Sequence, residues 1–564
     1  MRLSSSPRRV LAATMGGVLA ATLAACGGDS GGPTTGGGGG DDGGAAASAQ
    51  TLVFGGSADP VVIDGAFVSD GESIRVIRQI FEGLVTTEQG GTDIVPALAE
   101  SWEVDEEGTT WTFTLREGVK FHDGSEFNAE AVCTNFDRWY NFTGILQSPS
   151  VSYYWQTVFG GFAQNEGDLP ESLYSSCEAQ DPTTAVITLS KPSSTFLTSL
   201  SLPAFSMASP QALEEFGADD VSGSEDSPQF TGTYGTEHPT GTGAYKFQSW
   251  TRGDKLVVTA NEDYWGDKAQ IGTIIFRPIA DGPARRQALE AGDIDGYDLV
   301  DPSDVAALED GGFQVLRRPA FNVGYIGFNQ AAPPMDNPKF RQAIAHAINR
   351  EELVTTKYPE GAEVATQFQP PQLWGYNEGV PTYDYDPEKA KQLLEESGIA
   401  KPAVEFWFPT DVSRPYMPDP AGNFQLIKAD LEAAGIVVTS KSAPWSPDYL
   451  DAVDSGKAQM FLLGWTGDFG DPDNFIGTFF QTPQKLWGFK NQQLFTALDE
   501  AEAEPDQDKR EELYQDINAQ IMEFLPGLPY VHTEPAIAFR PGVDGYTPSP
   551  VNNEDFNKVT LSEG

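Results

Sequence analysis

Positively charged residues are scarce in this chain, and the scarcity excludes whole classes of partner. The sequence has 35 Lys and Arg against 82 Asp and Glu, which gives a formal net charge of −47 at pH 7. A surface this acidic repels the phosphates of nucleic acids and the headgroups of anionic lipids. We therefore exclude nucleic acid as a partner and exclude direct adsorption to an anionic membrane.

Residues that commonly carry catalysis or bind metals are also few. The sequence contains four histidines, which are far apart, and it has no His-Glu-x-x-His motif, no Gly-x-Ser-x-Gly motif and no Walker loop. The acidic run 293–298 is faintly similar to a calcium loop but lacks the Glu required at its twelfth position. These absences argue against an enzyme, and we expect neither a metal site nor a cofactor.

The N-terminus has the layout of an export signal. Arg8 and Arg9 precede a largely apolar run over residues 10–25, which is too short to span a bilayer and is typical of a secretory signal peptide. The run ends in Leu23-Ala24-Ala25-Cys26, which resembles a bacterial lipobox. We expect residues 1–26 to be a lipoprotein signal peptide ending at an acylated Cys26. An ordinary cleavage site is the alternative, and Arg8-Arg9 leaves general and twin-arginine export both open.

Large apolar residues are missing from residues 27–50, which are nearly all Gly, Ser, Thr, Asp and Ala. Such a segment cannot build a core and is expected to be a flexible tether spanning roughly 25–30 Å. The ~510 residues that follow exceed the usual size of one compact domain, so two or more lobes are expected.

Beyond the leader the chain has two cysteines, Cys133 and Cys177. In an exported protein a lone pair of cysteines indicates a disulfide, and two buried free thiols are the alternative.

Strand-like and helix-like patterns interleave along the chain, which predicts an α/β or α+β fold with several layers. Alternating apolar residues predict strands at 51–54, 111–115, 185–189, 256–259 and 273–276. Helical spacing and capping residues predict helices over 74–84, 340–353, 387–397, 424–434 and, as two helices, 492–524. Two β-rich stretches, 316–329 and 528–539, enclose helix-rich sequence. This arrangement predicts one lobe inserted into another through two crossing strands that act as a hinge.

One loop combines acidic, glycine and aromatic residues at the end of a predicted strand. Gly464–Phe475 contains three Asp, three Gly and large aromatic residues, and it follows the buried-looking strand 460–463. Elsewhere Arg414 and Tyr416 share a proline-rich loop, and Trp445 stands in a similar one. A carboxylate, an arginine and aromatic rings are what a zwitterionic ligand requires. A hydrogen-bonded loop without a ligand is the alternative.

At these residues the chain resembles the extracytoplasmic solute-binding proteins of ABC importers, in the peptide/nickel class (family 5), and within it the dipeptide-binding members. The resemblance covers nearly all of residues 51–564. It is carried, in order, by Leu115–Gly124, Pro239–Tyr245, Asn261–Gly266, Asn322–Tyr325, Arg341–Ile344, Trp374–Asn377, Arg414–Tyr416 and Gly464–Phe475.

The resemblance implies a two-lobe, periplasmic-binding-protein-like fold of type II, with hinge strands and an extra subdomain near residues 130–235. Lobe I would contain residues 51–318 and, after the chain returns, 530–564. Lobe II would contain residues 319–529.

The resemblance also implies the roles of individual residues. Asp468 would bind the α-ammonium group of a peptide and Arg414 its α-carboxylate, while Tyr416 and Trp445 line the pocket with Trp465 and Gly467 of the acidic loop. Two departures stand out. The spacing from Arg414 to Asp468 is one residue longer than in the dipeptide-binding pattern, with the insertion after Trp445, and Phe469 replaces a polar residue.

The implied function is that of a monomeric, lipid-anchored, non-enzymatic protein on the extracytoplasmic face of a bacterial cell membrane. It would capture short peptides, dipeptides in particular, and deliver them to an ABC permease. One alternative keeps the fold and changes the ligand to glutathione, haem, a metal chelate or an oligosaccharide. Another is a secreted hydrolase that uses Asp468 with a second carboxylate.

Overall fold

The computed structural model describes residues 48–224 and 227–562. The predicted signal peptide with Cys26, and nearly all of the predicted tether over 27–50, lie outside the described residues. In the part of the chain that is described, no helix combines the length and the apolar character needed to cross a membrane.

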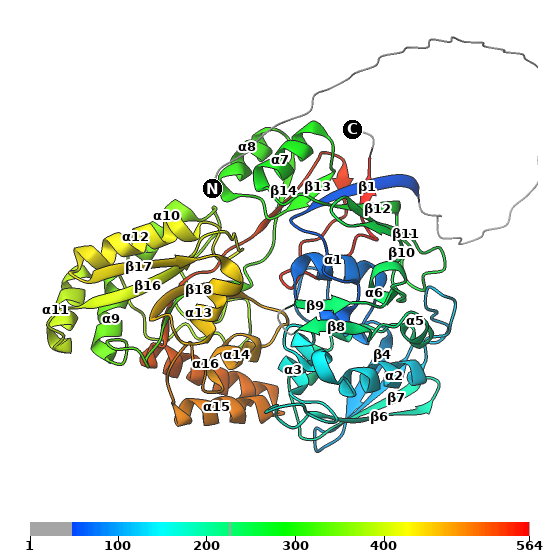
Figure 1. The fold of residues 1–564 in the computed structure, drawn as a ribbon, viewed down its shortest axis with the longest axis horizontal. Helices are drawn as coiled ribbons and strands as arrows, with labels where there is room; N and C mark the ends of the chain where they lie inside the picture. Colours follow the sequence, from blue (N-terminus) through cyan, green and yellow to red (C-terminus); the bar gives the residue numbers. More distant parts are fainter. Residues whose placement is uncertain (1–47, 225–226, 563–564) are drawn as a thin grey trace, which may run out of the picture. The chain divides into compact units, whose positions relative to one another are not determined.

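A seven-stranded sheet uses both ends of the described chain (Figure 1). Its strand order is β10-β11-β12-β1-β13-β20-β14. Strand β1 pairs in parallel with β12 and β13, whereas β20 pairs antiparallel with β13 and β14. The strands are β1 (Ser48–Gly56), β10 (Tyr245–Thr251), β11 (Lys255–Ala260), β12 (Ile271–Pro278), β13 (Gly296–Asp298), β14 (Gln314–Arg317) and β20 (Ala536–Phe539). The C-terminal segment therefore completes a sheet that the N-terminal strand begins.

A four-stranded sheet with the order β4-β5-β7-β6 lies in the first half of the chain. Its strands are β4 (Ala99–Val104), β5 (Thr110–Leu115), β6 (Tyr174–Asp181) and β7 (Thr184–Leu189), and helix α2 (Ala129–Tyr140) packs on β6 and β7.

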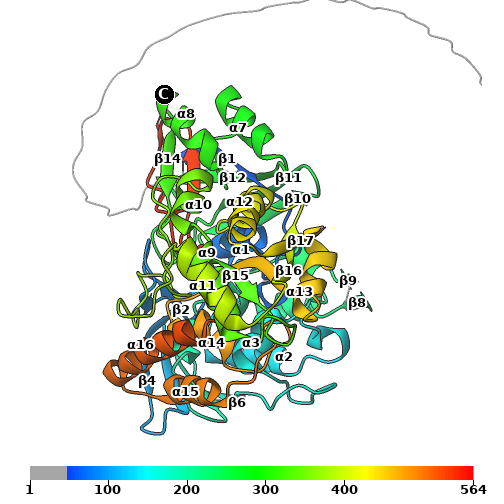
Figure 2. The ribbon, with the colours of Figure 1, turned by 90° about the vertical axis from the view of Figure 1, so that its left-hand side faces the viewer.

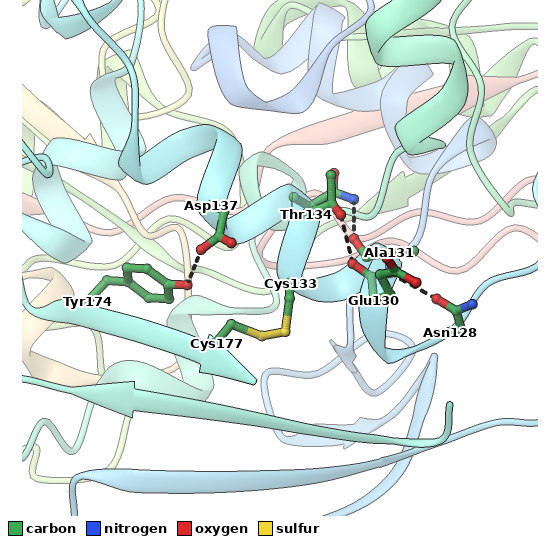
Figure 3. Close-up of a disulfide and its surroundings, with 9 residues drawn as sticks. Asn128, Glu130, Ala131, Cys133, Thr134, Asp137, Tyr174 and Cys177 are labelled. Carbon is green, nitrogen blue, oxygen red and sulfur yellow. Dashed lines mark hydrogen bonds between the residues drawn. A yellow bond between two sulfur atoms is a disulfide. The ribbon is translucent and has the colours of Figure 1, made fainter. Parts of the chain in front are cut away.

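A disulfide fastens α2 to this sheet. It joins Cys133 of α2 to Cys177 of β6, with the two Cα atoms 5.1 Å apart, and Tyr174 donates a hydrogen bond of 2.9 Å to Asp137 in the same interface (Figure 3). The disulfide closes the loop between Cys133 and Cys177, and closing a loop of that length stabilises a fold by about 4 kcal/mol in the chain-entropy model.

A five-stranded sheet, with the order β17-β16-β18-β15-β19, lies in the second half of the chain. Its strands are β15 (Asn322–Phe328), β16 (Ala403–Pro409), β17 (Val437–Ala443), β18 (Met460–Thr466) and β19 (Gly527–Val531). Strands β16 and β18 run parallel, so their carboxyl ends meet at one edge of the sheet. Helix α12 (Pro420–Ala433) packs on β16 and β17, and α9 (Pro338–Ala347) packs along α11 (Pro387–Ser397) (Figure 2).

The remaining elements connect these sheets or cover their faces. The other helices are α1 (Gly71–Ile80), α3 (Tyr153–Phe159), α4 (Phe196–Ser199), α5 (Pro210–Glu215), α6 (Tyr234–Glu237), α7 (Gly282–Ala291), α8 (Val305–Asp310), α10 (Arg350–Lys357), α13 (Leu450–Asp454), α14 (Ile476–Phe480), α15 (Gln492–Ala503) and α16 (Gln507–Phe524). The short helical turns are η1 (Gly65–Phe67), η2 (Gly144–Gln147), η3 (Pro203–Phe205), η4 (Pro302–Asp304), η5 (Trp445–Tyr449) and η6 (Pro472–Asn474). Within residues 48–224 and 227–562, three two-stranded ribbons pair β2 (Val85–Thr87) with β3 (Ile94–Pro96), β8 (Val221–Ser224) with β9 (Ser227–Phe230), and β21 (Val543–Asp544) with β22 (Thr560–Leu561).

Buried apolar side chains form two large clusters. One draws its residues from 52–276 and 537–559, and the other from 321–531 with Val551. Phe469 is an exception, because it follows β18 of the second group yet packs in the first cluster with 6% of its surface exposed. The mixed architecture confirms the predicted α/β class. We propose that the two clusters are the cores of the lobes predicted at 51–318 with 530–564 and at 319–529.

Local signals predicted some helices well and others poorly. Helix α11 has the predicted bounds, because Asp386 caps the amide of Lys389 and Gly398 takes a left-handed φ of 71°. The single helix predicted over 340–353 is wrong: it is two helices, α9 and α10, because the Asn349 side chain caps the amide of Glu352 and starts a new helix. Helix α12 begins at Pro420, before the predicted 424, because Asp419 caps it.

Candidate functional site

Asp468 lies in the loop after β18, where the backbone holds it firmly. Its amide donates to Oδ1 of Asn474 at 2.8 Å, and the neighbouring Gly467 amide donates to the carbonyl of Phe321 at 2.9 Å. Its carboxylate accepts hydrogen bonds from the Tyr154 hydroxyl at 2.8 Å and the Asn474 side-chain amide at 3.4 Å. Since Tyr154 belongs to α3 and Asp468 follows β18, this carboxylate is contacted from both halves of the fold.

The three aspartates of this loop are in different electrostatic situations. Asp471 is buried in a bidentate ion pair with Arg510, at 2.7 and 3.0 Å. Asp473 accepts a hydrogen bond from the Tyr514 hydroxyl at 3.3 Å, and burial raises the pKa of its carboxyl to about 8. Asp468 has no Lys, Arg or His within ion-pair distance among the described residues. Asp473 also forms no ion pair in the described residues, but its raised pKa of about 8 keeps it protonated at neutral pH. Asp468 is therefore the aspartate of the loop that is left to receive a cation.

The environment of Asp468 makes its charge costly. Its side chain is half-buried, and burial raises the pKa of the carboxyl to about 6, against the opposing effect of the hydrogen bonds from Tyr154 and Asn474. An ammonium group placed beside this carboxylate would remove that cost, because an opposite charge favours the ionised form.

The side chains of Arg414 and Trp445 contact each other. The guanidinium carbon of Arg414 lies 4.7 Å from the centroid of the Trp445 ring, and Trp445 stacks in turn on Tyr449. Two backbone hydrogen bonds between Arg414 and Met417 fix the turn that carries the arginine. Its Nε atom is buried and has no hydrogen-bond partner. No carboxylate of the described residues forms an ion pair with this arginine.

Tyr416 connects the loop that carries Arg414 to the acidic loop, Gly464–Phe475. Its side chain is 7% exposed and packs so closely on Gly464 of β18 that a Cβ added there would overlap the tyrosine ring. Gly467 is restricted in the same way, because a Cβ there would overlap the ring of Phe321. Both glycines thus permit a close approach that no other residue allows.

Trp465 lies near the end of β18, shortly before Asp468, and packs against residues of the same loop and of α14. It is half-buried, its indole N–H faces Asn474 Oδ1 at 3.3 Å, and its ring lies edge-on to that of Phe479.

A π-helical turn, η5, begins at Trp445, and the amide of Tyr449 bonds to the carbonyl of Pro444 five residues earlier. Such a turn holds one more residue than an α-helical turn. The turn spans Trp445–Tyr449, and the comparison with the dipeptide-binding pattern predicts one inserted residue directly after Trp445.

Two contacts near Asp468 were not predicted from the sequence. Tyr154 lies 314 positions away along the chain, so its hydrogen bond to Asp468 depends on the folded structure; its signal was the aromatic run Tyr153-Tyr154-Trp155. Phe469, noted only as a departure from the family pattern, inserts its ring into the other apolar cluster. Both residues link the acidic loop to the half of the fold that contains α3.

Residues 48–224 and 227–562 contain no group of three or more His, Cys, Asp and Glu side chains arranged to hold a metal ion. In the weakly calcium-like run, Asp298 is paired with Arg318 at 2.6 Å and Asp295 with Arg540.

Comparisons with known proteins place this chain in a family. The family model for the middle region of bacterial extracellular solute-binding proteins, family 5, matches residues 93–487. The dipeptide-binding protein of Escherichia coli K12 is 31% identical over 91% of this chain and 95% of its own length. Heme-binding protein A of Haemophilus influenzae is 30% identical over 91% of this chain and 92% of its own length. Among solved structures, a periplasmic binding protein of Helicobacter pylori in complex with the peptide STSA is 29% identical, with a TM-score of 0.74 over 91% of this chain and 98% of that one.

Proposed function

Because the chain belongs to the bacterial extracellular solute-binding proteins of family 5, we propose that it captures short peptides outside the cytoplasmic membrane and delivers them to an ABC permease. The observation that carries this proposal is a pair of opposite charges that have no ion-pair partner in the described residues. Asp468 and Arg414 follow the carboxyl ends of the adjacent parallel strands β18 and β16, and neither is in an ion pair within the described residues. A free peptide brings one ammonium and one carboxylate, so it supplies both missing partners.

We propose dipeptides as the main ligands. Their backbones and termini are the features shared by all of them, so a site of broad specificity should bind the termini and leave side chains to roomier surroundings. The relatives named above bind dipeptides, a four-residue peptide or heme according to their names. Heme and a neutral oligosaccharide have no ammonium group, so the absence of a cation beside Asp468 among the described residues favours a peptide over either of them. Glutathione and metal chelates remain the alternatives to be tested by binding measurements.

The remaining parts of the proposal follow from the leader sequence and the family. Acylation of Cys26 would anchor a monomer to the outer face of the membrane, with residues 27–50 as a tether. The protein would release its ligand unchanged. A hydrolase would need a second carboxylate working with Asp468, and Asp471 and Asp473 are already bonded to Arg510 and Tyr514.

Blocked peptides test the function directly. Asp468→Ala should weaken binding of a free dipeptide at least tenfold, since a charge-assisted hydrogen bond contributes roughly 1.5–3 kcal/mol. N-acetylation of the peptide should harm binding to the wild type by a similar factor and add little harm in the variant. Arg414→Ala should behave in the same way toward C-terminal amidation. Calorimetric titration measures all four combinations for each residue.

Two substitutions serve as matched controls. Asp516 is an exposed aspartate on α16, and Arg252 stacks on Trp250 at 4.0 Å much as Arg414 stacks on Trp445. Asp516→Ala and Arg252→Ala should leave peptide affinity unchanged. If doubly blocked peptides bind the wild type as tightly as free ones, the peptide-terminus assignment fails.

A further inference from the structure

A cavity of about 460 Å³ lies within the first half of the fold. Its walls come from the end of α1 and the loop that follows, from β2, from residues 264–267 after β11 and from the C-terminal segment 553–558. No described residue between 319 and 529 lines it, so it is separate from the site that contains Asp468 and Arg414. A space of this volume can hold a small ligand.

Polar side chains make up most of the cavity lining. Hydroxyl and amide groups are contributed by Thr86, Ser201, Ser206, Asn553 and Asn557. The Nδ2 atom of Asn557 donates to the carbonyl of Asp267 at 3.2 Å, but its Oδ1 atom is buried without a hydrogen-bond partner. A polar ligand suits such a lining, because an apolar one would displace water from these groups and leave them unsatisfied.

Arg78, in the last turn of α1, is a half-buried cation that lines the cavity and has no ion-pair partner among the described residues. Its Nη1 atom donates to Oδ1 of Asn553 at 3.0 Å. Its Nε atom is buried without a partner, and its Nη2 atom makes no hydrogen bond in the described part of the chain. Burial lowers the pKa of this guanidinium to about 10. A guanidinium with donors still free is well suited to a carboxylate.

Asp555, on the C-terminal segment, supplies an anion in the same cavity. Its carboxylate makes no hydrogen bond and no ion pair with any described residue, and burial raises its pKa against the opposing effect of Arg78 and Lys558. Arg78 and Asp555 therefore influence each other's pKa but are too far apart to bond directly. A small ligand that carries both charges can bridge the gap between them.

The other charged groups of the lining have hydrogen-bond partners or face water. The Glu82 carboxylate accepts hydrogen bonds from the Tyr264 hydroxyl at 2.7 Å, the Thr242 hydroxyl at 2.7 Å and the Trp265 indole at 2.9 Å. Lys558 is exposed and donates to Oε1 of Gln89 at 3.1 Å, and Asp267 is exposed. Arg78 and Asp555 are thus the half-buried pair of opposite charges that the described residues leave unmatched.

We propose that this cavity is a second binding site, which takes a free α-amino acid with a small polar side chain such as serine. The α-carboxylate lies against Nη2 of Arg78, the ammonium lies against Asp555, and the side chain lies among the surrounding hydroxyl and amide groups. An inorganic anion would leave Asp555 unpaired, and a polyamine would leave Arg78 unpaired. The inference does not depend on peptide binding at Asp468 and Arg414.

Calorimetric titration with L-serine and its blocked forms tests the inference. N-acetyl-L-serine lacks the ammonium and L-serinamide lacks the carboxylate, so L-serine should bind at least tenfold more tightly than either. The double variant Asp468→Ala/Arg414→Ala removes both charges of the peptide site. It should bind L-serine with the same affinity as the wild type, which distinguishes the two sites.

Asp555→Asn locates the effect within the cavity. The change keeps the shape of the side chain and removes a charge whose burial is unfavourable, so the fold should be retained. It should weaken L-serine binding at least tenfold and leave dipeptide affinity unchanged, and Arg78→Gln should weaken L-serine binding likewise. Asp516→Asn, at an exposed position of α16, is the matched control and should change neither affinity.

The outcomes separate this inference from the proposed function. No binding of L-serine at millimolar concentrations, or equal binding of L-serine and its blocked forms, overturns the amino-acid site. Loss of L-serine binding in the Asp468→Ala/Arg414→Ala variant also overturns it, since serine would then occupy the peptide site. Displacement of L-serine by inorganic phosphate would identify an anion site instead. If dipeptides fail to bind while L-serine binds as expected, the proposed function fails and the second site stands.

Discussion

At the scale of single residues, Asp468 should give ligand binding and protein stability opposite responses to pH. Burial raises the pKa of its carboxyl to about 6, and the ligand's ammonium requires the ionised form. The charges of a free peptide's own termini do not change between about pH 5 and pH 7. Peptide affinity should therefore fall about tenfold from pH 7 to pH 5, a change that calorimetry at a series of pH values would measure.

The stability of the folded, ligand-free protein changes with pH in the opposite direction. A carboxyl whose pKa is higher in the folded than in the unfolded state binds more protons when folded, so this group makes the fold more stable as pH falls from about 7 to about 4. Asp468→Asn should abolish most of the pH dependence of binding while lowering affinity. A tenfold fall in affinity that persists in Asp468→Asn would assign the titration to another group.

At the scale of elements, a buried cluster of four charges joins segments that are distant in sequence. Arg75 of α1 and Arg318, just after β14, face Asp298 of β13 and Glu554 of the C-terminal segment. Arg318 donates to Asp298 at 2.6 Å and to Glu554 at 2.5 Å, and all four side chains are at most 7% exposed. The cluster sits where the chain leaves the seven-stranded sheet for the five-stranded one.

Breaking this cluster should destabilise the whole fold. Glu554→Gln leaves Asp298 as the one buried carboxylate that both guanidinium groups share, with Glu72, 3.7 Å from Arg75, as the other partner of that arginine. Removal of one partner from a buried ion pair costs about 3–5 kcal/mol. Urea unfolding at neutral pH would show the loss as a lower midpoint. Glu290, which pairs with Arg286 at a partly exposed site, is the matched control, and Glu290→Gln should change stability by about 0–1 kcal/mol. Similar midpoints for the two variants would contradict the structural role of the cluster.

At the scale of the whole molecule, attachment to the membrane is expected to depend on one residue. The predicted anchor is the acyl group on Cys26, and lipid chains add binding energy in proportion to the CH₂ groups they bury. Cys26→Ser should therefore move the protein from the membrane fraction to the soluble extracytoplasmic fraction, which fractionation and immunoblotting would measure. A variant that stays with membranes would refute the lipobox assignment.

Features set by neighbouring residues could be predicted from the sequence, whereas features set by contacts between segments far apart in the chain could not. The cap of Asp386 and the left-handed Gly398 are local, so the bounds of α11 were predictable, whereas the break at Asn349 preserved the helical spacing and concealed two helices. For the site, Arg414, Trp445 and Asp468 stood out because their chemistry fits a zwitterion. Tyr154 and the position of Phe469 depend on packing between segments about 300 residues apart, which no periodicity encodes.

The position of β20 has a consequence for the order in which the protein can be assembled. Strand β20 fills the gap between β13 and β14, and Glu554 completes the charge cluster around Arg75. A chain made, or carried across a membrane, from its N-terminus has no such strand to insert until nearly all of it has emerged. The seven-stranded sheet therefore lacks the strand between β13 and β14 through most of that process. The seven-stranded sheet and the charge cluster can be completed only when these last residues are available.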